Sequence, residues 1–207
     1  MTLKKGVNLN EAASWRLGEI ISQNTRVNLL TINGRTVDVD VTGLCAGLQN
    51  NESITRLNFA RIDLSDTDKI ASLAPFLINN PNLIQITLRD CRIGPAGLNI
   101  LSNALSSRTV KTILWLNLSR NSFGDSTLDD LVGVLSRNTL LISLNLGKCK
   151  IGPAACSSLA PLLEDQGSTL RYLYLQHNSI DDPCAFTLAG LLRSNIRLET
   201  LDLTGNS

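Results

Sequence analysis

The chain has 207 residues, a formal net charge of +1 and 43% hydrophobic residues. This composition is typical of a globular protein with a substantial core, and it carries no bulk charge that would favour nucleic acid or an anionic membrane. The N-terminal residues lack the apolar run and cleavage site of a secretory signal, and no stretch approaches the roughly 20 apolar residues that span a bilayer. We therefore expect a soluble, cytoplasmic protein that selects its partner through local surface patches.

The first predicted element is a helix. Leu9, Ala13, Leu17 and Ile20 have the spacing of one helical face, which predicts a helical half-repeat over residues 8–23. From residue 27 to the C-terminus, one pattern then recurs, LxxLxLxx(N/C)x(I/L). Its copies start near residues 27, 54, 83, 113, 141, 170 and 198, at intervals of 27 to 30 residues.

Within each copy, the apolar residues first alternate as in a strand and then take helical spacing. After Asn178, for example, Ile180, Cys184, Leu188 and Leu191 follow one another at helical intervals. A single strand and helix cannot bury their own apolar face, so neighbouring copies must stack and share a core. The sequence therefore predicts one α/β solenoid domain over residues 1–207, with a parallel sheet on the concave face and helices on the convex face.

Proline and cysteine refine this prediction. Because proline suits the first turn of a helix, helices are expected to start at Gly94-Pro95, Gly152-Pro153 and Asp182-Pro183, whereas Pro75 and Pro161 should shorten the helices that contain them. The five cysteines are odd in number and lack the close pairs or histidines of a zinc site, so we expect reduced core thiols. The ninth position of the pattern should turn the chain and satisfy backbone groups; it holds Cys91, Asn121, Cys149, Asn178 and Asn206, but Arg35 and Ile62 in the first two copies.

The period near 28 and second halves such as IGPAGLNILSNAL and IGPAACSSLAPLL resemble the ribonuclease-inhibitor class of leucine-rich repeats, which NOD-like receptors and Ran GTPase-activating proteins share. The resemblance covers essentially the whole chain. It implies the leucine-rich-repeat fold but no single activity, because the class includes inhibitors, receptors, GTPase activators and scaffolds. The chain begins inside a repeat and stops at a strand, so we expect either a fragment of a longer protein or a missing half that a partner or a second copy supplies.

Outward positions of the pattern predict the functional face. The second, third, fifth, seventh and eighth positions should project from the concave sheet, and the eighth should form a basic stripe about 20 Å long. Trp, Tyr and Arg are the residue types that dominate binding energy at protein interfaces. The predicted partner-binding residues are Arg56, Arg61, Arg89, Trp115, Arg120, Lys148, Tyr172, Tyr174 and His177.

These residues favour binding over catalysis. His177 is the only histidine, the carboxylates are scattered and no Gly-rich phosphate loop follows a strand, so we expect no enzyme activity, cofactor or metal site. The leading hypothesis is a protein-interaction module whose partner has an acidic or mixed surface. The resemblance raises GTPase activation of the Ran type as the alternative, which GTP hydrolysis by a panel of small GTPases would test. Nucleic-acid binding is a weaker hypothesis because the overall charge is near neutral.

Overall fold

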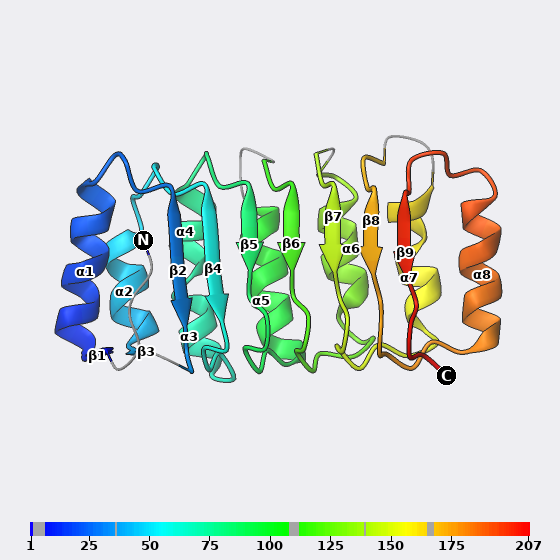
Figure 1. Ribbon diagram of the computed structural model, residues 1–207, viewed down its shortest axis with the longest axis horizontal. Coiled ribbons are helices and arrows are strands. Elements are labelled where there is room, and N and C mark those ends of the chain that lie inside the picture. Colours follow the sequence, from blue (N-terminus) through cyan, green and yellow to red (C-terminus); the bar gives the residue numbers. More distant parts are fainter. Residues whose placement is uncertain (2–6, 36, 108–111, 139, 165–167) are drawn as a thin grey trace.

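The computed structural model describes residues 1, 7–35, 37–107, 112–138, 140–164 and 168–207. Its strands lie side by side in one layer and its helices form a second layer behind them (Figure 1). The chain runs from α1 at one end of the row of coils to β9 and α8 at the other. This is the α/β solenoid that the repeat pattern predicts.

Seven strands form a parallel sheet in chain order, and the third position of every copy is aligned across it. Each strand is short because the chain turns away after the sixth position of the pattern. The strands are β2 (Leu29–Asn33), β4 (Arg56–Ala60), β5 (Gln85–Thr87), β6 (Trp115–Asn117), β7 (Ser143–Asn145), β8 (Tyr172–Tyr174) and β9 (Thr200–Asp202).

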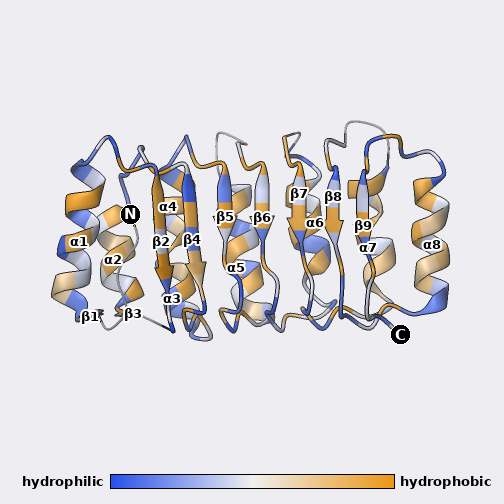
Figure 2. Ribbon diagram, in the orientation of Figure 1, coloured by the Kyte–Doolittle hydropathy of each residue, from blue (hydrophilic) through white to orange (hydrophobic). Residues whose placement is uncertain are grey.

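The helices cover one face of this sheet and leave the other open, and we call the open side the concave face. The fourth and sixth positions point into the core, as Leu144 and Leu146 do at 0% exposure. Figure 2 shows hydrophobic segments recurring in the strands and alternating with hydrophilic segments along the helices. The helices are α1 (Glu11–Gln23), α2 (Val41–Leu48), α3 (Thr67–Ala71), α4 (Ala74–Asn79), α5 (Pro95–Ser106), α6 (Leu128–Leu135), α7 (Ala155–Leu163) and α8 (Asp182–Leu192).

The ninth position joins neighbouring coils through buried hydrogen bonds, as predicted. The Asn121 side-chain oxygen accepts from the backbone N–H groups of Cys91 and Ile93, at 3.0 Å each. Its amide nitrogen donates to the carbonyls of Leu88 and Leu118, at 2.8 and 2.7 Å. Asn178 and Asn206 repeat this arrangement two and three coils farther on. These asparagines therefore have a structural role.

Cysteine at the ninth position supplies only the donor part of this arrangement, because its thiol donates to a carbonyl of the preceding coil. The Sγ atoms of Cys91 and Cys149 donate to the carbonyls of Phe59 and Leu118, at 3.1 and 3.3 Å. Both thiols are free and buried, as is the Cys45 thiol of α2. Burial raises the pKa of Cys91 to about 11 and the pKa values of Cys45 and Cys149 to about 12.

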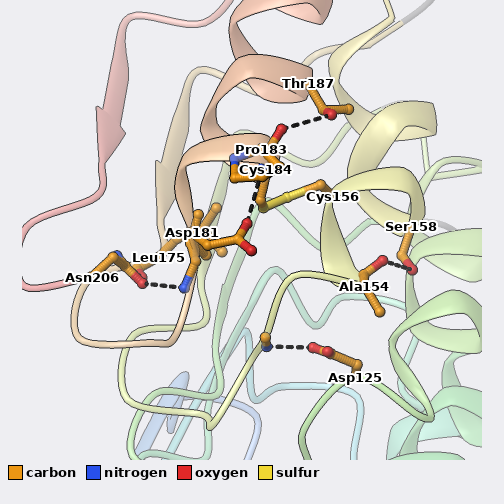
Figure 3. Close-up of a disulfide and its surroundings, with 12 residues drawn as sticks. Asp125, Ala154, Cys156, Ser158, Leu175, Asp181, Pro183, Cys184, Thr187 and Asn206 are labelled. Atoms are coloured by element: carbon orange, nitrogen blue, oxygen red, sulfur yellow. Dashed lines mark hydrogen bonds between the residues drawn. A yellow bond between two sulfur atoms is a disulfide. The ribbon is translucent and has the colours of Figure 1, made fainter.

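The prediction that all five cysteines are reduced is wrong for two of them. Cys156 of α7 and Cys184 of α8 form a disulfide between neighbouring coils, with their Cα atoms 5.5 Å apart (Figure 3). Their separation in sequence is 28 residues, about one repeat period. Stacking of the coils brings them together, and their spacing in the sequence alone did not indicate a pair.

We expect thiol titration to separate these two groups. The folded chain should show no rapidly reacting thiol at pH 8, because the three free thiols are buried and their raised pKa values keep them protonated. The denatured chain should titrate as three thiols without reductant and as five after reduction. A count of five without reductant would contradict the disulfide.

The raised pKa values of these buried thiols predict that the free energy of unfolding falls at alkaline pH. Below the ordinary thiol pKa of 9.0, the folded and unfolded chains are both protonated, and the fold keeps its full stability. Above that pH the unfolded chain ionises and the folded chain does not, so each unit of pH costs about 1.4 kcal/mol per thiol until the raised pKa is reached. Urea denaturation at pH 8 and pH 10 should therefore show a lower midpoint at pH 10, and a Cys45→Ala variant should lose less across this interval.

Prolines shape the convex helices, with one departure from prediction. Gly94 caps α5 and Pro95 begins it, as expected. Asp181, one residue before the expected Asp182, caps α8 by accepting from the backbone N–H of Cys184 at 3.0 Å. Gly152-Pro153 does not start α7, which begins at Ala155. The carboxylate of Asp125 holds the Gly152 N–H at 2.6 Å, and the next two residues form a turn (Figure 3).

Of the two interior prolines, Pro75 lies where its helical half is divided, as predicted, whereas Pro161 does not interrupt its helix. Pro75 falls in the first turn of α4, and the helical half of that repeat is divided into the short helices α3 and α4. Pro161 lies inside α7, which ends two residues later at Leu163. Proline cannot donate the N–H that would continue the preceding turn.

At the N-terminal end, α1 and α2 pack unusually closely. A Cβ atom on Gly18 of α1 would lie 2.3 Å from the Leu44 carbonyl oxygen, and one on Gly47 of α2 would lie 2.4 Å from the Trp15 carbonyl oxygen. A two-stranded parallel sheet, β1 (Val7–Leu9) and β3 (Val37–Val39), lies beside these helices. The repeat pattern predicted α1 but neither of these two strands.

Candidate functional site

Trp115 faces solvent from the concave side of the sheet. It opens β6, pairs in register with Gln85 and Ser143, and is 38% exposed. Its neighbour Leu116 is buried at 1%, so a core position for the tryptophan is excluded. The alternation along the strand therefore places the indole where the pattern predicted it.

The sheet around Trp115 is hollowed. Arg56 of β4 and Tyr174 of β8 line the same hollow as the indole, and the small Ser143 lies in the strand between β6 and β8. The hollow has a volume of about 760 Å³ and both apolar and polar lining. We call it the aromatic hollow, and its lining residues are Thr55, Arg56, Ile84, Gln85, Ile86, Thr87, Trp115, Leu116, Asn117, Ser143, Asn145 and Tyr174.

Tyr172 lies on the same face but is engaged elsewhere. It is at the third position of β8, and its hydroxyl donates to the carboxylate of Glu199 at 2.8 Å. That hydrogen bond, together with the negative charge of Glu199, raises the pKa of Tyr172. Glu199 also forms an ion pair with Arg171. Tyr172 is therefore held at the C-terminal side of the face and does not line the aromatic hollow.

Four of the predicted binding residues line one hollow where the strands end. Arg89, Arg120, Lys148 and His177 line a shallow hollow of about 410 Å³. Lys148 and His177 also line a second hollow of about 530 Å³ with Lys150. We call these five residues the cationic groove. Lys150 was missed from the sequence because the tenth position of the pattern was not among those expected to face outward.

The basic stripe contains one acidic residue, Asp90, at the eighth position of the third copy, as the sequence shows. The structure adds that the Asp90 carboxylate lies 3.5 Å from the Arg61 side chain. Arg61 is thereby separated from Arg120 and belongs to another hollow, of about 700 Å³, near the first repeats. Charges of both signs line that hollow, including Asp63 and Arg92, which pair at 2.7 Å.

The residues that the structure describes offer neither a metal cluster nor a membrane-spanning helix. No group of three or more His, Cys, Asp or Glu residues in this part of the chain is arranged to hold a metal ion. Among the same residues, no helix has both the length and the apolar character to cross a membrane.

Comparison with known proteins identifies the family. A family model described as Leucine Rich repeat matches residues 137–160 and 168–189. The ribonuclease inhibitor of Sus scrofa is 33% identical over 159 residues, which are 75% of this chain and 34% of that protein. The chain is a leucine-rich-repeat protein of the ribonuclease-inhibitor type.

Other leucine-rich-repeat relatives are similar along most of this chain. NACHT, LRR and PYD domains-containing protein 12 of Mus musculus is 27% identical over 183 residues, 86% of this chain and 17% of that protein. Leucine-rich repeat-containing protein 73 of Homo sapiens is 29% identical over 191 residues, 88% of this chain and 58% of that protein. The chain thus spans from about a sixth to about three fifths of the length of these curated relatives.

Solved structures are similar in fold at low identity. The tropomodulin C-terminal domain of Caenorhabditis elegans has a TM-score of 0.59 at 12% identity and covers 74% of this chain and 92% of its own. A structure titled Leiomodin-1 Actin-Binding Site 2 has a TM-score of 0.55 at 15% identity, covering 88% and 87%. At such identities the likeness concerns the fold of the leucine-rich-repeat chain alone.

Proposed function

We propose that this chain is a protein-interaction module that holds a partner protein on its concave face and acts by binding without catalysis. The distribution of large aromatic residues carries the proposal. The sequence has two tryptophans and two tyrosines, and Trp115, Tyr172 and Tyr174 all belong to β6 and β8. A solvent-facing indole contributes nothing to core packing, and its clustering with Tyr174 and Arg56 over an open hollow supports binding.

The relatives agree with this proposal in general terms. Leucine-rich-repeat proteins of the ribonuclease-inhibitor type support an interaction module. We propose a partner with an acidic or mixed surface, because cations adjoin the aromatic hollow. We also propose that the protein is cytoplasmic. The predicted binding residues divide into the hollow, with Arg56, Trp115 and Tyr174, and the groove, with Arg89, Arg120, Lys148 and His177. Tyr172 and Arg61 flank them.

Affinity capture from the native cell extract, followed by binding measurements with the captured protein, tests this proposal. Trp115→Ala should weaken binding by about 30-fold or more, because a central exposed tryptophan is the residue type that most often dominates interface energy. Ser143→Tyr should weaken it as well, because it fills the hollow without removing any contact group. Thermal unfolding should remain close to that of the wild type for Trp115→Ala.

Phe186→Ala is the matched control. Phe186 lies on α8, on the convex side, and is 80% exposed, so its removal deletes an aromatic side chain without altering the concave face. Binding should be unchanged in this variant. Equal loss of affinity in the Phe186 and Trp115 variants, or unfolding by Trp115→Ala, would contradict the proposed face.

A further inference from the structure

The arginines and lysines of the cationic groove form no ion pair with a described carboxylate. Arg89, Arg120, Lys148 and Lys150 have no carboxylate within 4.0 Å of their charged nitrogens in the part of the chain that the structure describes. The sequence agrees with this arrangement. In the copies that start at residues 113, 141 and 170, the third, fifth, seventh, eighth and tenth positions hold no Asp or Glu, although the chain has 18 acidic residues.

The turns that carry these residues have a left-handed backbone, which the repeat also adopts outside the groove at Arg61, Asp90 and Arg92. Arg120, Lys148, Lys150 and His177 have φ values between 57° and 61°, in the left-handed region that residues with a Cβ atom enter at a cost. Gly205 occupies the equivalent eighth position in the last copy, with φ of 70°. Glycine would therefore fit these turns with less strain than the long cationic residues that the middle repeats carry.

The groove and the aromatic hollow form one surface. Asn117 and Asn145 line both of them, so no ridge of another element separates the indole of Trp115 from Arg120 and Lys148. A single ligand segment can therefore contact both at once. Such a ligand would place its charged groups at the ends of the strands and an apolar group on the sheet.

We propose that the cationic groove binds an extended acidic peptide segment of the partner, with a neighbouring apolar side chain of that segment in the aromatic hollow. This inference rests on the proposed function and names the chemistry of the ligand. Strands are spaced by about 4.8 Å, so Arg120, Lys148 and His177 span roughly 10 Å, which equals about three residues of extended chain. Carboxylates on alternate residues of such a segment lie about 7 Å apart, a separation that the long side chains of Arg120 and Lys148 can span.

The ends of the groove favour a peptide over a nucleic acid. Asp90 lies at the eighth position next to Arg120, and Asp202 of β9 lies beyond His177. A regular polyanion that continued past the three middle repeats would meet a carboxylate on either side. A short acidic stretch bounded by neutral residues meets neither, and the net charge of +1 offers no long-range attraction for nucleic acid.

The test uses a fluorescein-labelled peptide of about ten residues, in which a short central run of alternating Glu and Thr is followed by one Leu and is bounded on both sides by neutral residues. A peptide with Gln in place of Glu and an oligothymidine of similar length are the comparison ligands. At about 50 mM salt, where screening is moderate, fluorescence anisotropy should show the Glu peptide binding about tenfold more tightly than the Gln peptide, since each of several exposed ion pairs adds a small gain.

Matched charge reversals locate the binding. Lys148→Glu should remove the preference for the Glu peptide, whereas Arg193→Glu, an identical change of charge at the C-terminal cap of α8, should leave it intact. Equal or absent binding of both peptides, tighter binding of the oligothymidine, or equal effects of the two reversals would overturn the inference. The captured partner distinguishes this failure from failure of the proposed function, because loss of its binding in Trp115→Ala does not depend on the peptide result.

Discussion

Replacing Asn121 by alanine is expected to destabilise the fold by about 3–5 kcal/mol, because four buried backbone groups each lose a hydrogen bond and, among the described residues, only the Leu118 carbonyl keeps another donor, the Cys149 thiol. Asn121 is 1% exposed, so bulk water cannot freely replace the lost amide. The groups belong to two neighbouring coils, and their loss weakens the junction between the third and fourth copies of the repeat. Urea denaturation followed by circular dichroism measures the change in free energy of unfolding.

Two further variants separate the buried amide from asparagine as such. Asn121→Cys should lower the free energy of unfolding less than Asn121→Ala does. A thiol at the ninth position can donate to a carbonyl of the preceding coil, as the Cys149 thiol donates to the Leu118 carbonyl. Asn117→Ala, at the end of β6 in the same copy of the repeat, should cost under about 1 kcal/mol, because its side chain accepts one local bond from the Ser119 N–H. Similar losses in the Asn117 and Asn121 alanine variants would contradict the structural role of the ninth position.

Gly18→Ala is expected to destabilise the N-terminal coils by about 3 kcal/mol, although alanine favours helices more than glycine does. The added Cβ atom would lie 2.3 Å from the carbonyl oxygen of Leu44, so α1 and α2 must move apart. Because each coil of a solenoid contacts only its neighbours, the damage should remain local. Hydrogen exchange should accelerate in α1 and α2 and stay unchanged in α6.

Gly133→Ala in α6 and Gly190→Ala in α8 provide the opposite expectation. A Cβ atom at either position meets nothing within 4 Å, so helix propensity alone decides the result. Each substitution should stabilise the chain by about 0.5–1 kcal/mol. Stabilisation by Gly18→Ala to the same degree would show that the close helix contact does not exist.

The fold could be predicted from the sequence because the same strand and helix pattern recurs in successive copies of the repeat. Leucines that alternate and then take helical spacing predict a strand and a helix, and seven copies fix which residues align across the sheet. The side of the sheet on which Trp115 lies follows from that alignment, since a shift by one residue would bury it beside Leu116. The role of Asn121 was predictable for the same reason.

The remaining features depend on what stacking brings together. The Cys156–Cys184 disulfide joins equivalent places in two coils, and nothing local in either segment indicates the pair. The Arg61–Asp90 contact likewise joins side chains of two coils. Lys150 enters the groove because the turn after the strand takes a left-handed conformation, a property of backbone geometry that the repeat pattern does not express.

Site-specific photo-crosslinking to the captured partner tests the central claim most directly. A photoreactive amino acid in place of Gln85, whose side chain is already long, lies on β5 in register with Trp115, whereas one at position 157 lies on the exposed side of α7. Recognition by the concave face predicts a crosslink to the partner from position 85 and none from position 157. Crosslinking from position 157 alone would place the partner on the helices and contradict recognition by the concave face.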